Sequence, residues 1–361
     1  SALKDWLNLL SPDVTNLSER LKIIIINPPW EHEEDEEGHY IDIAAKNAEQ
    51  LAIELSTNIQ HLVEYIPLLL LGEQKQTFVF GRRLAIESKN VDNLLEHVMV
   101  ELGHIDNPNT RFAKGLLSGI HVNSIDAWNH YLEEFLSRKE LIKFYPDMLC
   151  TGEMQSFHLA KLLLLINKGD LRADSVFVLS YGSVTSHLSG NDISSFCLAL
   201  ADIDAKSAWI ALDIMFMHCL GNSNKFIENK VSLKALVTKV CLDYRNKSRH
   251  SDMYHWEEVA KKLFVTEGVP FCKDICRQII AAAEGDLDYG DISNHIKPLL
   301  QNMMQLYGES IWPIFSEAII SANSTQLHYF QLLLEKLDKF ADTQLSVFSL
   351  LPFDLIINWC K

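Results

Sequence analysis

Apolar residues recur every three or four positions from Pro67 to Met148, with polar residues between them. This spacing places the apolar side chains on one face of an α-helix, so the stretch predicts a run of amphipathic helices. Glycine, proline or asparagine stands at each predicted break, as at Gly72, Gly103 and Asn107-Pro108. The stretch carries no catalytic motif and therefore indicates a helical scaffold.

The same period continues through most of the chain and predicts an all-α fold. The expected helices cover residues 3–10, 14–26, 41–71 with a break near 56–58, 73–89, 90–103, 108–122, 124–136, 151–168, 189–200, 205–220, 225–243, 253–266, 268–285, 292–307, 309–322, 324–340 and 343 onward. The 10 prolines and 15 glycines are few for 361 residues, and this scarcity of turn formers favours helix over sheet. A strand is expected at most over 175–181, where a buried helix fits the neighbouring sequence better.

The predicted helices group into repeats of nearly constant length. Pro67 and Pro108 are 41 residues apart, and Pro108 and Pro146 are 38 residues apart. HEAT-like arrays show such a spacing, whereas tetratricopeptide (TPR) arrays run nearer 34 residues. We therefore expect a HEAT/TPR-like helical-repeat solenoid of antiparallel helix pairs. Residues 1–40 would form N-terminal helices and an acidic loop, 41–222 the first half of the array, and 223–361 the second half after the break at 220–224. The start without Met and the apolar helical C-terminus indicate a fragment of a longer protein.

Several residues are expected to pack between helices. Gly115 and Gly119 lie one turn apart in an apolar helix, and we interpret them as a close approach of two helices within the array. Four side chains on apolar helical faces are expected to be buried: Leu116, Leu163, Trp209 and Phe216.

The most acidic segment, Glu31–Glu37, follows Asn27-Pro28-Pro29-Trp30 and holds six carboxylates within seven residues. Two prolines stop a helix, and so many like charges cannot pack, so the segment predicts a loop. A divalent-metal site or a site for a basic partner is one interpretation. A solvated acidic loop is the other, and it is favoured.

The net charge of −16 disfavours general binding to nucleic acid and to anionic membranes. A single cluster of basic residues, Tyr244–Asp252, is suited to bind an acidic partner or a phosphate. Lysine and arginine in a turn, however, are usually only solvated. The longest apolar runs, Leu68–Leu71 and Leu162–Ile166, are far too short to span a bilayer, and no signal peptide is visible. The seven cysteines include no Cys-x-x-Cys pair and are expected to be reduced core residues of a cytoplasmic protein.

Catalytic motifs are missing. The sequence contains no Gly-x-x-x-x-Gly-Lys-Ser/Thr, no Gly-x-Ser-x-Gly and no His-Glu-x-x-His. The fourteen histidines show no metal-ligand spacing, and the adjacent acids Glu133-Glu134 and Glu257-Glu258 diverge on a helix surface. We therefore expect no enzyme activity, cofactor or metal, and the sequence assigns no catalytic or binding residue.

Five segments, taken in order, are similar to a known group of proteins: 68–82, 107–119, 181–182, 211–218 and 351–360. Together they resemble the C-terminal α-helical repeat region of large bacterial antiphage defence proteins. In those proteins an effector, such as a nuclease or a sirtuin-type NADase, precedes a STAND-type NTPase or the repeats themselves. The resemblance implies a sensor region that binds a phage protein and controls an effector or NTPase domain elsewhere in the same polypeptide.

Three functional hypotheses follow. The favoured one is a recognition module whose concave inner surface holds a protein. The second is a general α-helical adaptor without a link to defence. The third is an α-helical metal-dependent enzyme that uses the acidic segment 31–37.

Overall fold

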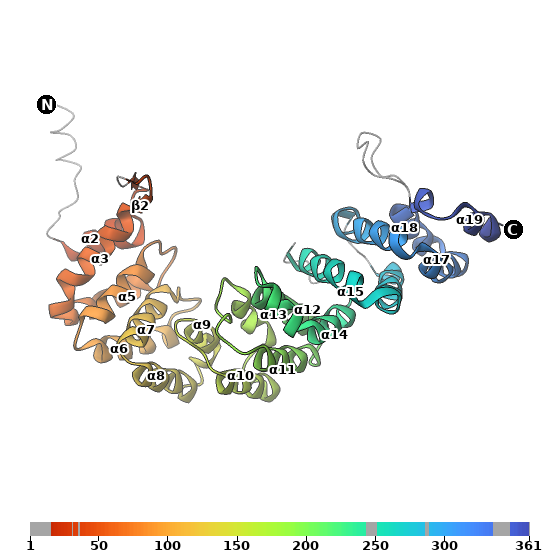
Figure 1. The fold of residues 1–361 in the computed structure, drawn as a ribbon. Coiled ribbons are helices and arrows are strands. Elements are labelled where there is room, and N and C mark those ends of the chain that lie inside the picture. Colours follow the sequence, from red (N-terminus) through yellow and green to blue (C-terminus); the bar gives the residue numbers. More distant parts are fainter. Residues whose placement is uncertain are drawn as a thin grey trace, which may run out of the picture. The chain divides into compact units, whose positions relative to one another are not determined.

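The computed structural model describes residues 16–30, 32–34, 37–242, 251–285, 289–334 and 347–360. The chain divides into two compact units, and helices make up most of both (Figure 1). The first unit comprises residues 1–154 and 168–172, and the second comprises 155–167 and 173–361. The break predicted at 220–224 lies inside the second unit. Within the described residues, every helix is too short or too polar to cross a membrane.

The described part of the first unit starts with a short two-part helix and a hairpin, and helices follow. Its elements are α2 (Leu17–Arg20), the π-helix η1 (Leu21–Ile26), β1 (His32–Glu34), β2 (Tyr40–Asp42), α3 (Ile43–Leu55), the 3-10 helix η2 (Ser56–Tyr65), α4 (Ile66–Leu69), α5 (Thr77–Glu87), α6 (Val91–His104), α7 (Arg111–Asn123), α8 (Ile125–Ser137), the 3-10 helix η3 (Ile142–Phe144) and α9 (Tyr145–Leu149). The break predicted near 56–58 is present, because Asn58 has a non-helical backbone inside η2. The predicted helix 3–10 lies outside the described residues.

The second unit is helical throughout its described part. Its elements are α10 (Ser156–Lys168), the 3-10 helix η4 (Ala173–Ser180), α11 (Gly190–Ala201), α12 (Ala205–Cys219), α13 (Ser223–Glu228), α14 (Lys230–Lys239), α15 (Ser251–Ala281), η5 (Ala282–Glu284), α16 (Tyr289–Asp291), the π-helix η6 (Ile292–Ile296), α17 (Lys297–Ser321), α18 (Ser324–Leu334), η7 (Val347–Leu350) and α19 (Phe353–Cys360). Gly268, with φ of 65°, interrupts α15, and Tyr307 interrupts α17. These are the two places where the sequence predicts one helix to end and the next to begin.

Polar side chains mark where several helices start. Asp42, Ser124, Ser189 and Asp204 each accept a hydrogen bond from a backbone N–H in the first turn of the following helix. Those N–H groups have no partner within the helix, so such caps fix its first residue. The break predicted before residue 124 therefore has a direct physical cause in Ser124.

Glycines let α5 and α7 pack backbone to backbone. A Cβ added at Gly115 would overlap the carbonyl oxygen of Phe78, and one at Gly119 would lie 2.7 Å from the Cβ of Ala85. The predicted close helix approach is thus confirmed. Gly81 lies inside α5, within the helix predicted over 73–89, and an added Cβ there would lie 2.8 Å from the carbonyl oxygen of Phe112.

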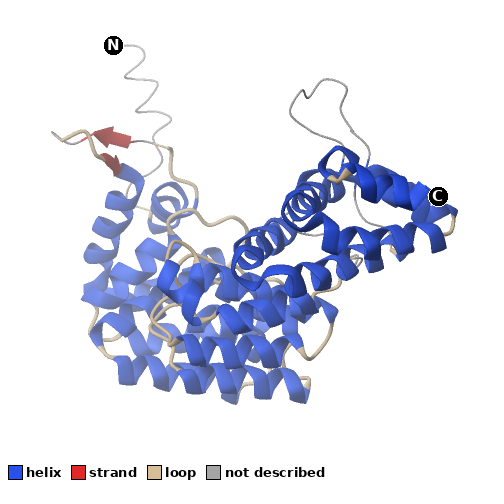
Figure 2. Ribbon diagram, turned by 45° about the vertical axis from the view of Figure 1, so that its right-hand side comes forward, coloured by secondary structure: helices blue, strands red, loops and turns tan. Residues whose placement is uncertain are grey.

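The all-α prediction is confirmed, as is the preference for a buried helix near 175–181, but confining any strand to that segment is wrong. Residues 173–180 form the 3-10 helix η4, with Val176 and Leu179 buried. The strands of the described residues are β1, inside the acidic segment, and β2, shortly after it, and they pair antiparallel (Figure 2). The loop prediction is therefore wrong for His32–Glu34. Successive side chains of a strand point to opposite faces. Both faces of β1 are open to solvent, so its carboxylates stay hydrated although they lie on a strand.

Three of the four predicted core residues are buried. Leu116, Trp209 and Phe216 are at most 7% exposed. Leu163 is only half-buried, so that prediction is wrong, because Leu159, Leu162 and Ile166 form the buried face of α10. Of the cysteines predicted to lie in the core, Cys241 and Cys360 are exposed and Cys150 is half-buried, whereas four are buried: Cys197, Cys219, Cys272 and Cys276.

Candidate protein-docking surface

Two prolines end η1 and leave a tryptophan on the surface. Pro28 and Pro29 lack the backbone N–H that a helix needs, and η1 stops at Ile26. Trp30 follows them and is 85% exposed, more than any other large hydrophobic residue of the described chain. A tryptophan so exposed contributes nothing to the core, and its large ring is well suited to contact a partner.

The β1–β2 hairpin gathers aromatic rings around Trp30. Its register pairs His32 with Asp42 and Glu34 with Tyr40, so these four side chains share one face. The His32 ring stacks on the Tyr40 ring at a centroid distance of 5.4 Å, and the indole Nε1 of Trp30 donates to the Tyr40 hydroxyl at 3.1 Å. We call Trp30, His32 and Tyr40 the hairpin aromatic cluster. All three are exposed.

An apolar recess lies beside this cluster. It has a volume of about 110 Å³, and its lining residues are Ile23, Ile24, Pro28, Pro29, Ala44 and Asn47. A water molecule in the liquid occupies about 30 Å³, so the recess has room for a small apolar side chain. Pro29 precedes Trp30 directly, and Ala44 follows β2 closely, so the recess is lined by segments that adjoin the cluster. We refer to both together as the docking surface.

The docking surface is strongly acidic. Residues 28–42 contain seven carboxylates and neither lysine nor arginine. Of these carboxylates, Glu33, Glu34 and Glu37 are exposed, and Glu37 lies 3.6 Å from the imidazole of His39. Across the described residues, no three His, Cys, Asp or Glu side chains are placed to hold a metal ion. The described residues therefore offer no set of ligands that would support the divalent-metal interpretation of segment 31–37.

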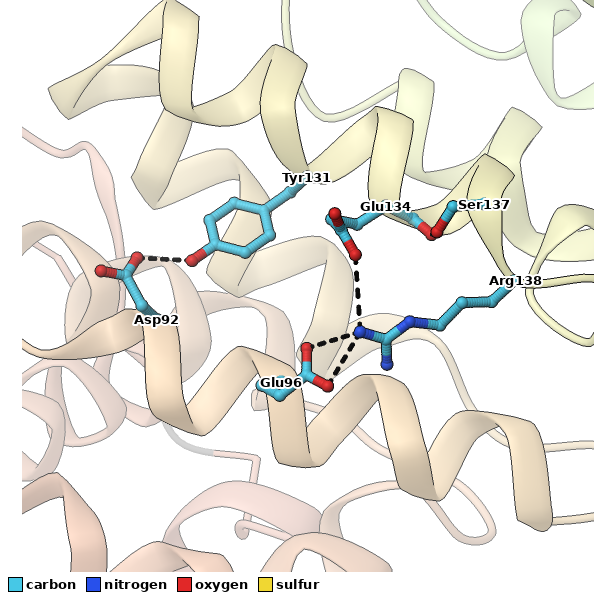
Figure 3. Close-up of polar contacts among 6 residues, drawn as sticks. All are labelled: Asp92, Glu96, Tyr131, Glu134, Ser137 and Arg138. Atoms are coloured by element: carbon cyan, nitrogen blue, oxygen red, sulfur yellow. Dashed lines mark hydrogen bonds and ion pairs between the residues drawn. The ribbon is translucent and has the colours of Figure 1, made fainter.

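Away from the docking surface, a set of hydrogen-bonded polar side chains joins α6 and α8 (Figure 3). The Tyr131 hydroxyl donates to Asp92 at 2.5 Å, and Arg138 Nη2 donates to both carboxylate oxygens of Glu96 at 2.8 Å. Arg138 also lies 3.5 Å from Glu134. Burial, together with the Asp92 carboxylate, raises the pKa of Tyr131 above its usual value. A phenol with a raised pKa stays protonated and remains a donor, so this group fastens one helix to another.

In the second unit, two buried carboxylates each pair with a half-buried imidazole. Asp213 of α12 accepts from His255 Nδ1 at 2.5 Å, and Glu257 of α15 accepts from His295 Nδ1 at 2.8 Å. The His255 ring stacks on Phe216 at 4.1 Å between centroids. In hydrolases such a pair orients a base toward a nucleophile. Here the His255–Asp213 pair connects α15 to α12, and the His295–Glu257 pair connects η6 to α15.

The buried cysteines are poor nucleophiles. Burial raises the pKa of Cys219 and Cys272 to about 11 and that of Cys150 and Cys276 to about 12. A cysteine attacks as the thiolate, and at neutral pH these groups are thiols. Their role is to fill space in the core, as predicted for the buried ones.

Comparisons with protein-family models, with curated proteins and with solved structures find no match to this chain. The docking surface combines exposed aromatic rings with an apolar recess, two properties of a protein-binding site, and carries a cluster of carboxylates.

Proposed function

We propose that this chain is a non-catalytic protein-recognition region. One observation carries the proposal: the exposed Trp30 stands in an aromatic cluster beside an apolar recess. Aromatic anchors next to a pocket that accepts an apolar side chain are typical centres of protein interfaces. The absence of phosphate-binding and nucleophile motifs from the sequence supports a binding role.

The resemblance of segments 68–82, 107–119, 181–182, 211–218 and 351–360 extends this proposal. On that basis the region is the sensor of a cytoplasmic bacterial antiphage defence protein. It binds a phage protein and controls an effector or NTPase domain of the same polypeptide. The packed helix pairs α7–α8 in the first unit and α11–α12 in the second support the further proposal that each unit is a degenerate HEAT-like or TPR-like array.

Capture of defined phage proteins tests the recognition role. The immobilised chain is mixed with purified phage structural and replication proteins, one at a time, and with duplex DNA at physiological salt. We expect one of the proteins to be retained and the DNA to pass through, because the net charge of −16 repels phosphate. Retention of DNA with no protein bound would contradict the proposal.

Matched variants locate the binding surface. The double variant Trp30→Ala and Tyr40→Ala removes two exposed rings from the docking surface and is expected to abolish capture. The control variant Tyr289→Ala and Phe353→Ala removes two rings that are 54% and 74% exposed in the second unit and should bind normally. If the first variant binds as well as the control, the docking surface is not the recognition site.

A further inference from the structure

Resting on the proposed function, we propose that the docking surface binds an arginine-rich segment of its protein partner. The surface presents ring faces, carboxylates and an apolar recess within one short stretch of chain. Each of these features selects a different part of such a segment.

The aromatic faces suit a guanidinium group. Trp30 is 85% exposed and Tyr40 is 56% exposed, so ring surface is open to solvent although the two side chains are hydrogen-bonded to each other. A cation over a tryptophan or tyrosine face is attracted by the electrons of the ring, and arginine is found there more often than lysine. Its guanidinium is planar and weakly hydrated, so it stacks on a ring with little loss of hydration.

The carboxylates select the sign of the partner's charge. Glu33 lies on the opposite face of β1 from His32, and Glu34 lies on the same face as Tyr40, so negative charge flanks the cluster on both sides. Residues 28–42 contain no lysine or arginine that would compete for these carboxylates. An acidic segment would be repelled here, and a basic one is both attracted and oriented.

The recess specifies the neighbour of the arginine. Ile23, Ile24 and the two prolines give it an apolar lining, and Asn47 is its one polar lining residue. A leucine or valine next to an arginine would fill it while the guanidinium covers Trp30. The preferred ligand is therefore a basic segment that also carries aliphatic residues.

Binding of labelled peptides to the full chain tests the inference. The probes are fluorescein-labelled peptides with the repeat Arg-Gly-Leu, the same repeat with lysine, and the same repeat with glutamate. We expect the arginine peptide to bind most tightly, the lysine peptide more weakly and the glutamate peptide not at all. Affinity should fall as salt rises from about 0.05 M to 0.5 M, because screening shortens the reach of the carboxylates. Absence of arginine-peptide binding would overturn the inference.

Variants separate a built site from general attraction to an acidic protein. Trp30→Ala with Tyr40→Ala should weaken arginine-peptide binding about tenfold, and Trp30→Phe with Tyr40→Phe should restore most of it. Glu33→Gln with Glu34→Gln should weaken binding and flatten its salt dependence. Glu284→Gln with Glu309→Gln removes the same charge from exposed positions in the second unit and should change little. Equal weakening by both glutamate pairs would show non-specific attraction and overturn the inference.

Failure of this inference is distinguishable from failure of the proposed function. If the alanine variant loses the captured phage protein while the arginine peptide never binds, the docking surface recognises a protein of other chemistry. If the alanine variant keeps the protein, the recognition role of this surface fails whatever the peptides do. Circular dichroism and thermal unfolding of each variant confirm that the fold is retained.

Discussion

Gly115 of α7 faces the backbone carbonyl oxygen of Phe78 in α5 at a distance that leaves no room for a methyl group. Gly115→Ala should therefore force the two helices apart. The obstructing atom belongs to the backbone of α5 and cannot rotate away. We expect a loss of about 1–3 kcal/mol in the free energy of unfolding, the usual cost of overpacking, measured by urea denaturation.

Gly103→Ala is the matched control for this substitution. Gly103 also lies within a helix, α6, but an added Cβ would lie 2.9 Å from the Cγ of Glu140. Glu140 is exposed, so its flexible side chain can turn aside. Replacing a helical glycine with alanine favours the helix by about 1 kcal/mol, so this variant should be neutral or more stable. Equal losses at both glycines would show that the α5–α7 contact is not specially close.

Two leucines that look alike in sequence should respond differently to truncation. Leu116 is fully buried, whereas Leu163 is half-buried on α10. Leu116→Ala should cost about 2–5 kcal/mol in unfolding free energy, because it removes buried methyl groups and leaves a cavity. Leu163→Ala should cost less than half as much. A comparison of urea midpoints decides the point, and similar midpoints would contradict the helix phase that the structure gives α10.

The helices of this chain were predictable because their cause is local. The period of apolar residues and caps such as Ser124 lie within a few residues of the structure that they produce. The phase of α10 was not predictable from Leu162–Ile166, because an apolar run has no polar face to set it. Which of its leucines is buried depends on the neighbouring helices.

The docking surface was hidden from sequence reasoning by its charge. Trp30, His32 and Glu34 occupy alternate positions before Gly38, and Tyr40 comes two residues after that glycine. This pattern is a weak signal for a hairpin. Six carboxylates in seven residues indicated a loop more strongly. The pairs that connect distant helices were equally hidden, since Asp213 and His255 lie 42 positions apart. Which residues become such partners depends on how the helices pack together, and not on the local sequence.

The Tyr131–Asp92 hydrogen bond should contribute modestly to stability. Tyr131 is buried, but Asp92 is exposed and water can replace its partner. Tyr131→Phe should therefore lower the unfolding free energy by about 1 kcal/mol. A double-mutant cycle with Asp92→Ala should give a coupling energy of similar size. A coupling energy near zero would show that the contact shown in Figure 3 adds nothing to stability.

His218 should make stability depend on pH below neutrality. Its imidazole Nδ1 lies 2.9 Å from the carbonyl oxygen of Thr185, which only accepts, so Nδ1 carries the hydrogen. The other nitrogen, Nε2, is buried without a hydrogen-bond partner. Burial, reinforced by the charge of Lys225, lowers the pKa of His218 below its usual value of 6.5. The folded state therefore holds His218 neutral.

The sign of the effect follows from this lowered pKa. Below about pH 6.5 the unfolded chain binds a proton at His218, whereas the folded chain does not yet bind one. Acid therefore favours unfolding. The contribution of neutral His218 is fully present above pH 6.5 and is lost as the pH falls toward the lower pKa of the folded state. The loss cannot exceed about 1.4 kcal/mol per pH unit. His218→Asn keeps a donor for Thr185 but does not titrate. We expect urea denaturation between pH 7 and pH 5 to show wild-type stability falling more steeply than that of His218→Asn. Parallel curves over this range would mean that His218 binds protons equally in both states, which would contradict its burial against Thr185.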